Sequence, residues 1–217
     1  MEHLDTLQLV ALAAALGWAS GIRLYAVLFI VGAMGYLGWF ELPTHLRILA
    51  HPLVLSASGF MVFVEFFADK IPGVDTLWDV AHTLVRIPAG AALAAGVFGD
   101  STPAWTIAAA IVGGTLAAGS HFTKAGARMA INTSPEPFSN WAASFGEDLL
   151  VGVLLYLALA HPIALFLVLA LLLALTVWLL PRLWHFVRSI VPRALRWFGY
   201  ADAASSASPG SGRPGNV

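Results

Sequence analysis

The stretch "WASGIRLY", residues 18–25, interrupts an apolar run that extends from Leu4 to Phe40. A helical membrane span needs about 20 mostly apolar residues, so this run is too long for one straight span. Its serine, glycine and arginine favour a broken helix, or a half-helix followed by a span. The run from Ala104 to Ile131 is also long and contains the polar stretch "GSHFTKAGAR". We therefore predict that segments 4–40 and 104–131 are broken or re-entrant.

Apolar runs dominate the rest of the chain up to residue 181. Hydrophobic residues make up 59% of the chain and charged residues 11%, and the mean hydropathy is +0.81. Soluble domains carry about 25% charged residues, so these values indicate an integral membrane protein. We predict an all-α, polytopic transmembrane helix bundle of about six spans over residues 1–181. In addition to the two long segments, four runs have the length of an ordinary span: Leu49 to Phe67, Leu77 to Phe98, Asn140 to Ala160 and Pro162 to Leu180.

The two long segments share a short sequence pattern. "SGIRLYAV" at Ser20 to Val27 and "AGARMAIN" at Ala125 to Asn132 both contain a small residue, then Gly-x-Arg. Each segment is followed by two further spans. This order raises the hypothesis of a three-plus-three inverted repeat, with one copy in residues 1–100 and the other in 104–181. An odd number of spans per copy would invert the second copy, as in many transporters.

The chain changes character after the last apolar run. "RLWHFVRSIVPRALRWF" alternates arginine with large apolar residues, which is typical of a basic amphipathic helix at the membrane surface; we assign it to residues 182–200. A simpler interpretation is a span end anchored by arginines and tryptophans. The composition of residues 201–217 predicts a disordered tail. The basic C-terminal part favours a multi-pass membrane protein with both termini cytoplasmic. The absence of cysteine excludes disulfides and thiolate metal sites.

Charged residues concentrate in "VEFFADKIPGVDTLWDVAHTLVR", residues 64–86. Glu65 and Asp69 are four residues apart and share one face at the end of a helix. "KIPG" then predicts a tight turn. The two helices joined by this turn would present acidic faces to each other. The second helix carries one stripe at offsets of four, seven and eleven residues: Asp75, Asp79, His82 and Arg86.

The second half of the chain supplies a counterpart to these charges. His121, Lys124 and Arg128 form another helical stripe, and "SFGEDLL" places two acids inside the fifth span. A charge at the bilayer centre costs at least roughly 2.5–3.5 kcal/mol, so such residues should pair, face the interior or line a wet cavity. Loop solvation or single structural pairs explain some members, but not the whole set. The candidate substrate- or ion-binding residues are Arg23, Glu65, Asp69, Lys70, Asp75, Asp79, His82, Arg86, His121, Lys124, Arg128, Glu147 and Asp148.

Three stretches carry a resemblance to a known family: "VEFFADKIPGVDTLWDVAHTLVRIPAGA", "HFTKAGARMAINTSPEP" and "SFGEDL". Together they resemble the bacterial membrane-protein family catalogued as domain of unknown function four-one-two-six. The resemblance covers nearly the whole chain apart from the basic tail. It implies a polytopic inner-membrane protein of unassigned activity, and it implies no catalytic role for any residue.

Three functions compete at this point. A transporter of a small ion or of an anionic lipid head group fits the broken helices and the charged interior. A non-catalytic membrane scaffold is the alternative. An intramembrane enzyme would use Asp79 with His82, or a divalent metal on Asp75, Asp79 and His82, but no His-Glu-x-x-His or Gly-x-Ser-x-Gly motif is present. We expect no enzymatic activity, no metal and no cofactor. The expected partners are the lipid bilayer and an anionic lipid, not nucleic acid; the oligomeric state stays open.

Overall fold

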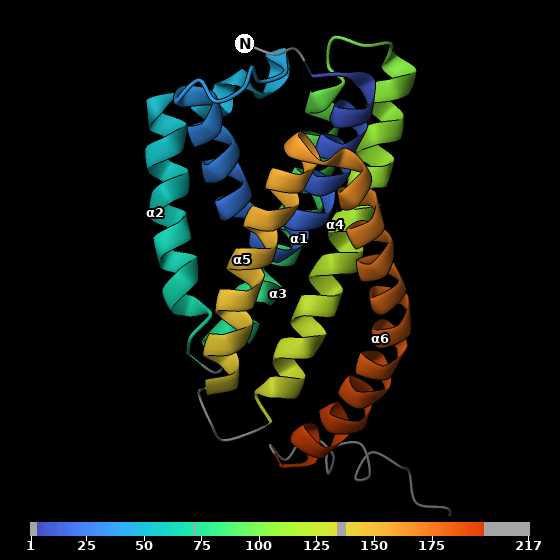
Figure 1. Cartoon of the computed structure of the whole chain (residues 1–217). Coiled ribbons are helices and arrows are strands. Elements are labelled where there is room, and N and C mark those ends of the chain that lie inside the picture. The colour runs from blue at the N-terminus through green and yellow to red at the C-terminus, as the bar shows by residue number, and fades with distance from the viewer. Residues whose placement is uncertain (1–3, 72, 134–137, 198–217) are drawn as a thin grey trace, which may run out of the picture.

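The computed structural model describes residues 4–71, 73–133 and 138–197 (Figure 1). Over these residues the fold is all-α, as predicted, and contains no strand. The last three residues of the predicted interfacial helix, 198–200, and the predicted disordered tail, 201–217, lie outside the described residues. The elements are α1 (Thr6–Tyr36), the short 3-10 helix η1 (Thr44–Ala50), α2 (Pro52–Ala68), α3 (Val74–Val97), α4 (Pro103–Ile131), α5 (Phe138–Ala160) and α6 (Pro162–Trp197).

The helices have the lengths and the apolar composition of membrane spans. Five segments pass this test: α1, α3, α4, α5 and residues Pro162–Phe186 of α6. The pair η1 and α2, bent by 67°, forms a sixth. The prediction of about six apolar segments is confirmed, and the chain is a multi-pass membrane protein.

The predicted break in the first segment is confirmed at Arg23. Its backbone angles, φ −143° and ψ 74°, are not helical, and they divide α1 into arms 6–22 and 24–36. Figure 1 shows the first arm descending from the end marked N and the second returning to that end. One pocket is lined by Leu4 and Gln8 from the start of α1 and by Met34 from its end, so both ends of the hairpin lie together. Helix α1 is therefore a re-entrant helical hairpin.

The hairpin reaches deep into the bundle without crossing it. At 1.5 Å per residue the two arms are about 25 and 20 Å long, less than the roughly 30 Å of a hydrocarbon core. The first arm is buried on almost every side. It packs closely on α4 through Gly17 and Gly21: a Cβ at Gly17 would lie 2.7 Å from the Cα of Gly113. The tip of the hairpin, at Arg23, is thereby fixed among α2, α3, α4 and α5.

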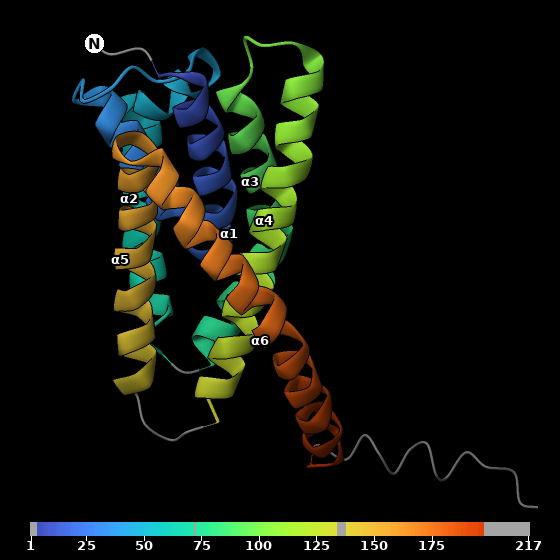
Figure 2. The same cartoon turned by 45° about the vertical axis from the view of Figure 1, so that its right-hand side comes forward.

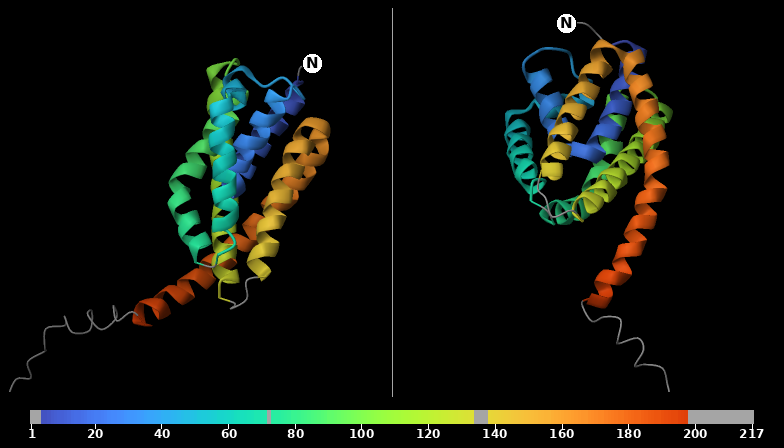
Figure 3. Two further views of the ribbon diagram at one scale, coloured as in Figure 1. Left: turned by 90° about the vertical axis from the view of Figure 1, so that its left-hand side faces the viewer. Right: turned by 60° about the horizontal axis from the view of Figure 1, so that its bottom comes forward.

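The break expected in segment 104–131 is absent. Helix α4 is one continuous helix over Pro103–Ile131, and its polar residues are accommodated as a buried stripe on an intact backbone. The two Gly-x-Arg segments thus differ in backbone conformation, and the inverted repeat stays a prediction. Helix α6 also continues through residues 182–197, where we predicted a separate interfacial helix. Figure 3 shows this part of α6 extending beyond the ends of the other helices.

The two ends of the described chain lie at opposite ends of the bundle. Residue 4 is near the end marked N, and the C-terminal end of α6 is at the other (Figure 2). Because α1 folds back on itself, the crossing helices in the described chain are α2 to α6, an odd number. The expectation that both termini are cytoplasmic stays a prediction, which depends on whether α1 crosses the membrane.

The close approach of Gly21 to α4 gives a test of the hairpin packing. A Cβ at Gly21 would overlap the Ala117 carbonyl oxygen and the Ser120 hydroxyl. We expect Gly21→Ala to lower the free energy of unfolding in detergent by about 1–3 kcal/mol, and so to lower the melting temperature. Gly146→Ala is the control, because a Cβ there meets nothing within 4 Å; it should be neutral or stabilising by up to about 1 kcal/mol. Equal effects of the two substitutions would contradict the packing described.

The absence of native cysteine allows a test of the hairpin topology by single-cysteine labelling. We expect a membrane-impermeant maleimide to label Thr6→Cys, Leu37→Cys and Ser101→Cys from the same side of sealed vesicles. Thr133→Cys, an exposed position at the far end of α4, should react only from the opposite side. Labelling of Thr6→Cys and Leu37→Cys from different sides would show that α1 crosses the membrane.

Candidate functional site

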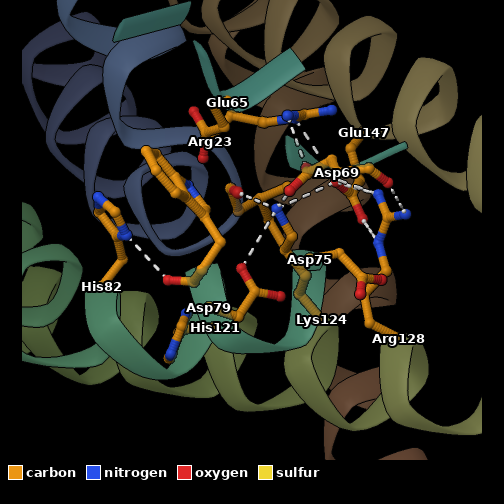
Figure 4. A network of polar contacts seen from close by, with 12 residues as sticks. Arg23, Glu65, Asp69, Asp75, Asp79, His82, His121, Lys124, Arg128 and Glu147 are labelled. Carbon is orange, nitrogen blue, oxygen red and sulfur yellow. Dashed lines mark hydrogen bonds and ion pairs between the residues drawn. The ribbon is translucent and has the colours of Figure 1, made fainter. Parts of the chain in front are cut away.

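The tip of the hairpin places a buried arginine at the meeting point of several helices (Figure 4). The Arg23 guanidinium lies 2.7 Å from an Asp69 carboxylate oxygen at the end of α2, and 3.0 Å from Asp148 on α5. It also donates to the Ser144 hydroxyl at 2.7 Å. Only 2% of its surface is exposed. The residue that breaks α1 thus connects α2 with α5.

The same break makes a backbone acceptor available inside the bundle. The last four carbonyls of a helix have no intrahelical donor, and Ile22 is the last residue of the first arm. Lys124 of α4 donates from its ammonium to the Ile22 carbonyl at 3.0 Å. The ammonium lies 3.0 Å from Asp69, 3.3 Å from Glu147 and 3.6 Å from Asp79. Lys124 therefore joins α4 to α1, α2, α3 and α5.

Arg128 follows Lys124 by one helical turn. Its guanidinium binds both oxygens of Glu147, at 3.2 and 3.0 Å, in the bidentate geometry that makes arginine–carboxylate pairs strong. It also donates to the backbone carbonyls of Asp69 and Asn140, both at 3.1 Å. These contacts hold the end of α2 and the start of α5 against α4.

Arg86 forms the other side of the cluster and is fully buried. It donates to Asp79 at 2.6 Å and makes a short contact with Glu65 of α2. Its guanidinium also lies 3.4 Å from Nδ1 of His121. Because Asp79 also faces Lys124, this group is continuous with the ion pairs at the hairpin tip.

Four bases and five acids form this charge network. If all are ionised, the network carries one net negative charge. Burial disfavours the charged form of Asp69, but Lys124, Arg23 and Arg128 outweigh this and lower its pKa. The acids of α5 are the accessible part, since 15% of the Glu147 side chain and 37% of the Asp148 side chain are exposed. The members are Arg23, Arg86, Lys124, Arg128, Glu65, Asp69, Asp79, Glu147 and Asp148.

Two other predicted site residues have structural contacts outside this network. Asp75 accepts from the backbone N–H groups of Gly73 and Thr76, where Gly73 has φ +86°, and from the Asn132 side chain. It therefore stabilises the turn before α3. Lys70 lies over the Phe66 ring, 2.9 Å from its centroid.

The two predicted histidines flank the network. His82 contacts the Tyr25 hydroxyl at 3.1 Å and the Trp78 carbonyl at 2.8 Å. His121 binds the Thr83 hydroxyl at 2.8 Å in addition to Arg86. The hypothesis of a metal on Asp75, Asp79 and His82 is wrong, because these three side chains have separate partners. Among the described residues no group of three such ligands is placed to hold a metal ion.

Several contributing groups were not predicted from the sequence. Ser144 and Asn140 bind Arg23 and Arg128 from α5, and the Ile22 carbonyl binds Lys124. The two side chains had a detectable signal: residues 140, 144, 147 and 148 fall on one helical face that leads to the predicted acids. The role of the Ile22 carbonyl follows from the break in α1, and the type of residue at that position does not predict it.

The charge network is packed rather than open. The pockets found elsewhere in the described chain, of about 140 to 670 Å³, are lined by other residues. One of them, of about 670 Å³, is an apolar groove between α4 and α6. Within the network, one carboxylate oxygen of Asp69 and one of Asp79 are buried without a hydrogen-bond partner. The polar groups are therefore close-packed, with these two acceptors and the Nε–H groups of Arg23 and Arg86 left without a hydrogen-bond partner.

A re-entrant hairpin whose tip is held by buried ion pairs, inside a bundle of crossing helices, defines a polytopic membrane protein with a charged interior site. Residues 10–182 match the family model described as "Domain of unknown function (DUF4126)", and the chain belongs to this family. The matched segment includes the hairpin, the whole charge network and the start of the basic part of α6. No curated protein and no solved structure matches the chain. The family resemblance seen in the sequence is confirmed.

The burial of Arg86 predicts a large cost for its removal. Arg86→Met leaves Glu65 and Asp79 buried without their guanidinium, and breaking a buried pair in this way costs about 3–5 kcal/mol. Denaturant unfolding in detergent micelles would measure this loss. Arg47→Met is the matched control, because Arg47 and Glu41 form an ion pair in which the arginine is 59% exposed; such pairs contribute about 1 kcal/mol or less. A similar small cost at both positions would contradict the burial described for Arg86.

Proposed function

We propose that the protein is a membrane transporter for a small cation or for protons, and that the charge network at the hairpin tip is its binding site. The observation that carries this proposal is the excess of carboxylates in a buried site where two acceptor oxygens lack a partner. Ionisable residues inside membrane spans commonly mark ion pathways and proton relays. Broken helices at such sites are a recurrent feature of secondary transporters.

The charge balance favours a cation over an anion. Each of the four bases already contacts at least one carboxylate: Arg23 and Lys124 both contact Asp69, Arg86 contacts Asp79, and Arg128 contacts Glu147. An anionic lipid head group would have to displace one of these carboxylates before it could bind. A cation or a proton would instead reduce the net negative charge of the site. Of the two substrates expected from the sequence, we therefore favour a small ion over an anionic lipid head group.

Access to the site is proposed from the end where the helices α4 and α5 are joined. Glu147 and Asp148 are the partly exposed members of the network, whereas Asp69 and Lys124 are buried. The two arms of the hairpin fill the path toward the opposite end. Transport would therefore require the hairpin tip to move relative to α4, which breaks and re-forms contacts of Arg23 and Lys124.

The distribution of charges gives an orientation. The connection from α2 to α3, which contains Lys70, lies at the same end as the C-terminal part of α6, which contains Arg182 and Arg188 (Figure 1). Positive residues accumulate on the cytoplasmic side of membrane proteins. We propose that this end faces the cytoplasm of a bacterial cell and that the start of α1 faces the other side. We assign the site no catalytic role, cofactor or nucleic-acid partner.

Purified protein in liposomes provides the test. We expect wild-type protein to accelerate movement of Na⁺, K⁺ or protons down an imposed gradient, followed with ion-sensitive dyes. Glu147→Gln removes an accessible carboxylate that binds Lys124 and Arg128, and should lower the rate at least roughly tenfold. Asp100→Asn, an exposed acid at the other end of the bundle, is the control and should keep the wild-type rate. No movement of any of these ions by folded wild-type protein would favour the scaffold hypothesis.

A further inference from the structure

The ammonium of Lys124 is surrounded by oxygen atoms from four separate elements. These are the Ile22 carbonyl at 3.0 Å from the break in α1, Asp69 at 3.0 Å, Glu147 at 3.3 Å and Asp79 at 3.6 Å. An ammonium has three N–H donors and no acceptor, so these oxygens bind it as they would bind a free cation. The four oxygens form a cage that we name the Lys124 cage.

With the Lys124 ammonium in place, no group of three Asp, Glu, His or Cys side chains in the described chain is arranged to hold a metal ion, but the oxygens of the Lys124 cage are of the kind that hard cations take. Hard cations take carboxylate and carbonyl oxygens, and in transporters the carbonyl at the C-terminal end of a half-helix binds Na⁺. The cage combines both, with Ile22 as the half-helix end. Asp69 and Asp79 each hold a further buried oxygen without a partner, so additional acceptors are available to a guest.

We infer that Lys124 is a tethered substitute for a monovalent cation: the cage binds Na⁺ or K⁺ when the ammonium withdraws, and the two compete. The inference rests on the proposed function for its role in transport. Exchange of one single positive charge for another preserves the charge balance of Asp69, Asp79 and Glu147. Lys124 suits this exchange, because its charge is at the end of a flexible four-carbon stem.

The neighbouring arginines do not fill the same role. Arg23 and Arg128 each hold several fixed acceptors with a planar guanidinium, and neither contacts the Ile22 carbonyl in the hydrogen bonds described. Without Lys124, Asp69 and Glu147 would keep their arginine contacts, but the cage itself would lose its only ammonium. Removal of Lys124 changes the formal charge of the network from −1 to −2, and excess buried negative charge is unfavourable, so the empty cage should take up a cation from solution.

Cysteine chemistry at position 124 tests this inference, because the chain has no other cysteine. Melting temperatures of Lys124→Cys are measured in NaCl, KCl and choline chloride at equal ionic strength. We expect a saturable rise of roughly 3 °C or more with Na⁺ or K⁺ over choline, and none for wild-type protein. Modification with 2-aminoethyl methanethiosulfonate restores an ammonium and should abolish the rise. The neutral methyl methanethiosulfonate should not.

Lys70→Cys is the matched control, since it removes one lysine charge outside the network and should gain no cation dependence. Lys124→Met provides a second uncharged variant. Folding of both Lys124 variants only in Na⁺ or K⁺ would support the inference. Folding in none of the salts, equal stability in all three salts, or stabilisation by acid alone would overturn it. These readouts measure binding without transport, so inactive wild-type liposomes would reject the proposed function while leaving this result to stand separately.

Discussion

The structure depends on one constraint: a helix that is broken inside a membrane protein must satisfy its backbone polar groups without bulk water. The break at Arg23 leaves the Ile22 carbonyl at a helix end, and Lys124 supplies its donor. A buried lysine at that position needs carboxylates to compensate its charge, and those carboxylates in turn pair with further bases. This one requirement thus explains the arrangement of the hairpin, the ends of α2 and α5, and the polar faces of α3 and α4. Non-helical backbone is tolerated at membrane depth only where protein or a wet cavity covers it.

The sequence predicted the class of fold and most of the network, and the reason is physical. Charges are so costly in an apolar chain that Glu65, Arg86 and Lys124 had to face the interior and one another. Helical periodicity then predicted which of them share a face. The residues that did not join the network, such as Asp75 and Lys70, lie at the ends of helices, where capping and aromatic contacts are available. A position near a helix end does not by itself separate the two groups, because Asp69, at the end of α2, belongs to the network.

Other features depended on contacts distant in the sequence. "SGIRLYAV" and "AGARMAIN" have similar composition, but only the first is broken: the backbone leaves the helical conformation at Arg23, whereas α4 is continuous. Whether a long apolar run crosses or turns back is decided by the space that its neighbours leave. The orientation of the termini stays a prediction, and it depends on whether the first segment crosses the membrane.

The network also links stability to function more tightly than a list of ion pairs suggests. Asp69 lies within 3.7 Å of three bases, and Glu147 likewise contacts three, so neither carboxylate belongs to one pair. Withdrawal of one base would leave both acids with two others, which lowers the cost of moving a single member. A network of shared contacts can therefore remain folded while one ammonium exchanges for another cation. Isolated buried pairs lack this property, because removal of either member leaves a fully uncompensated charge.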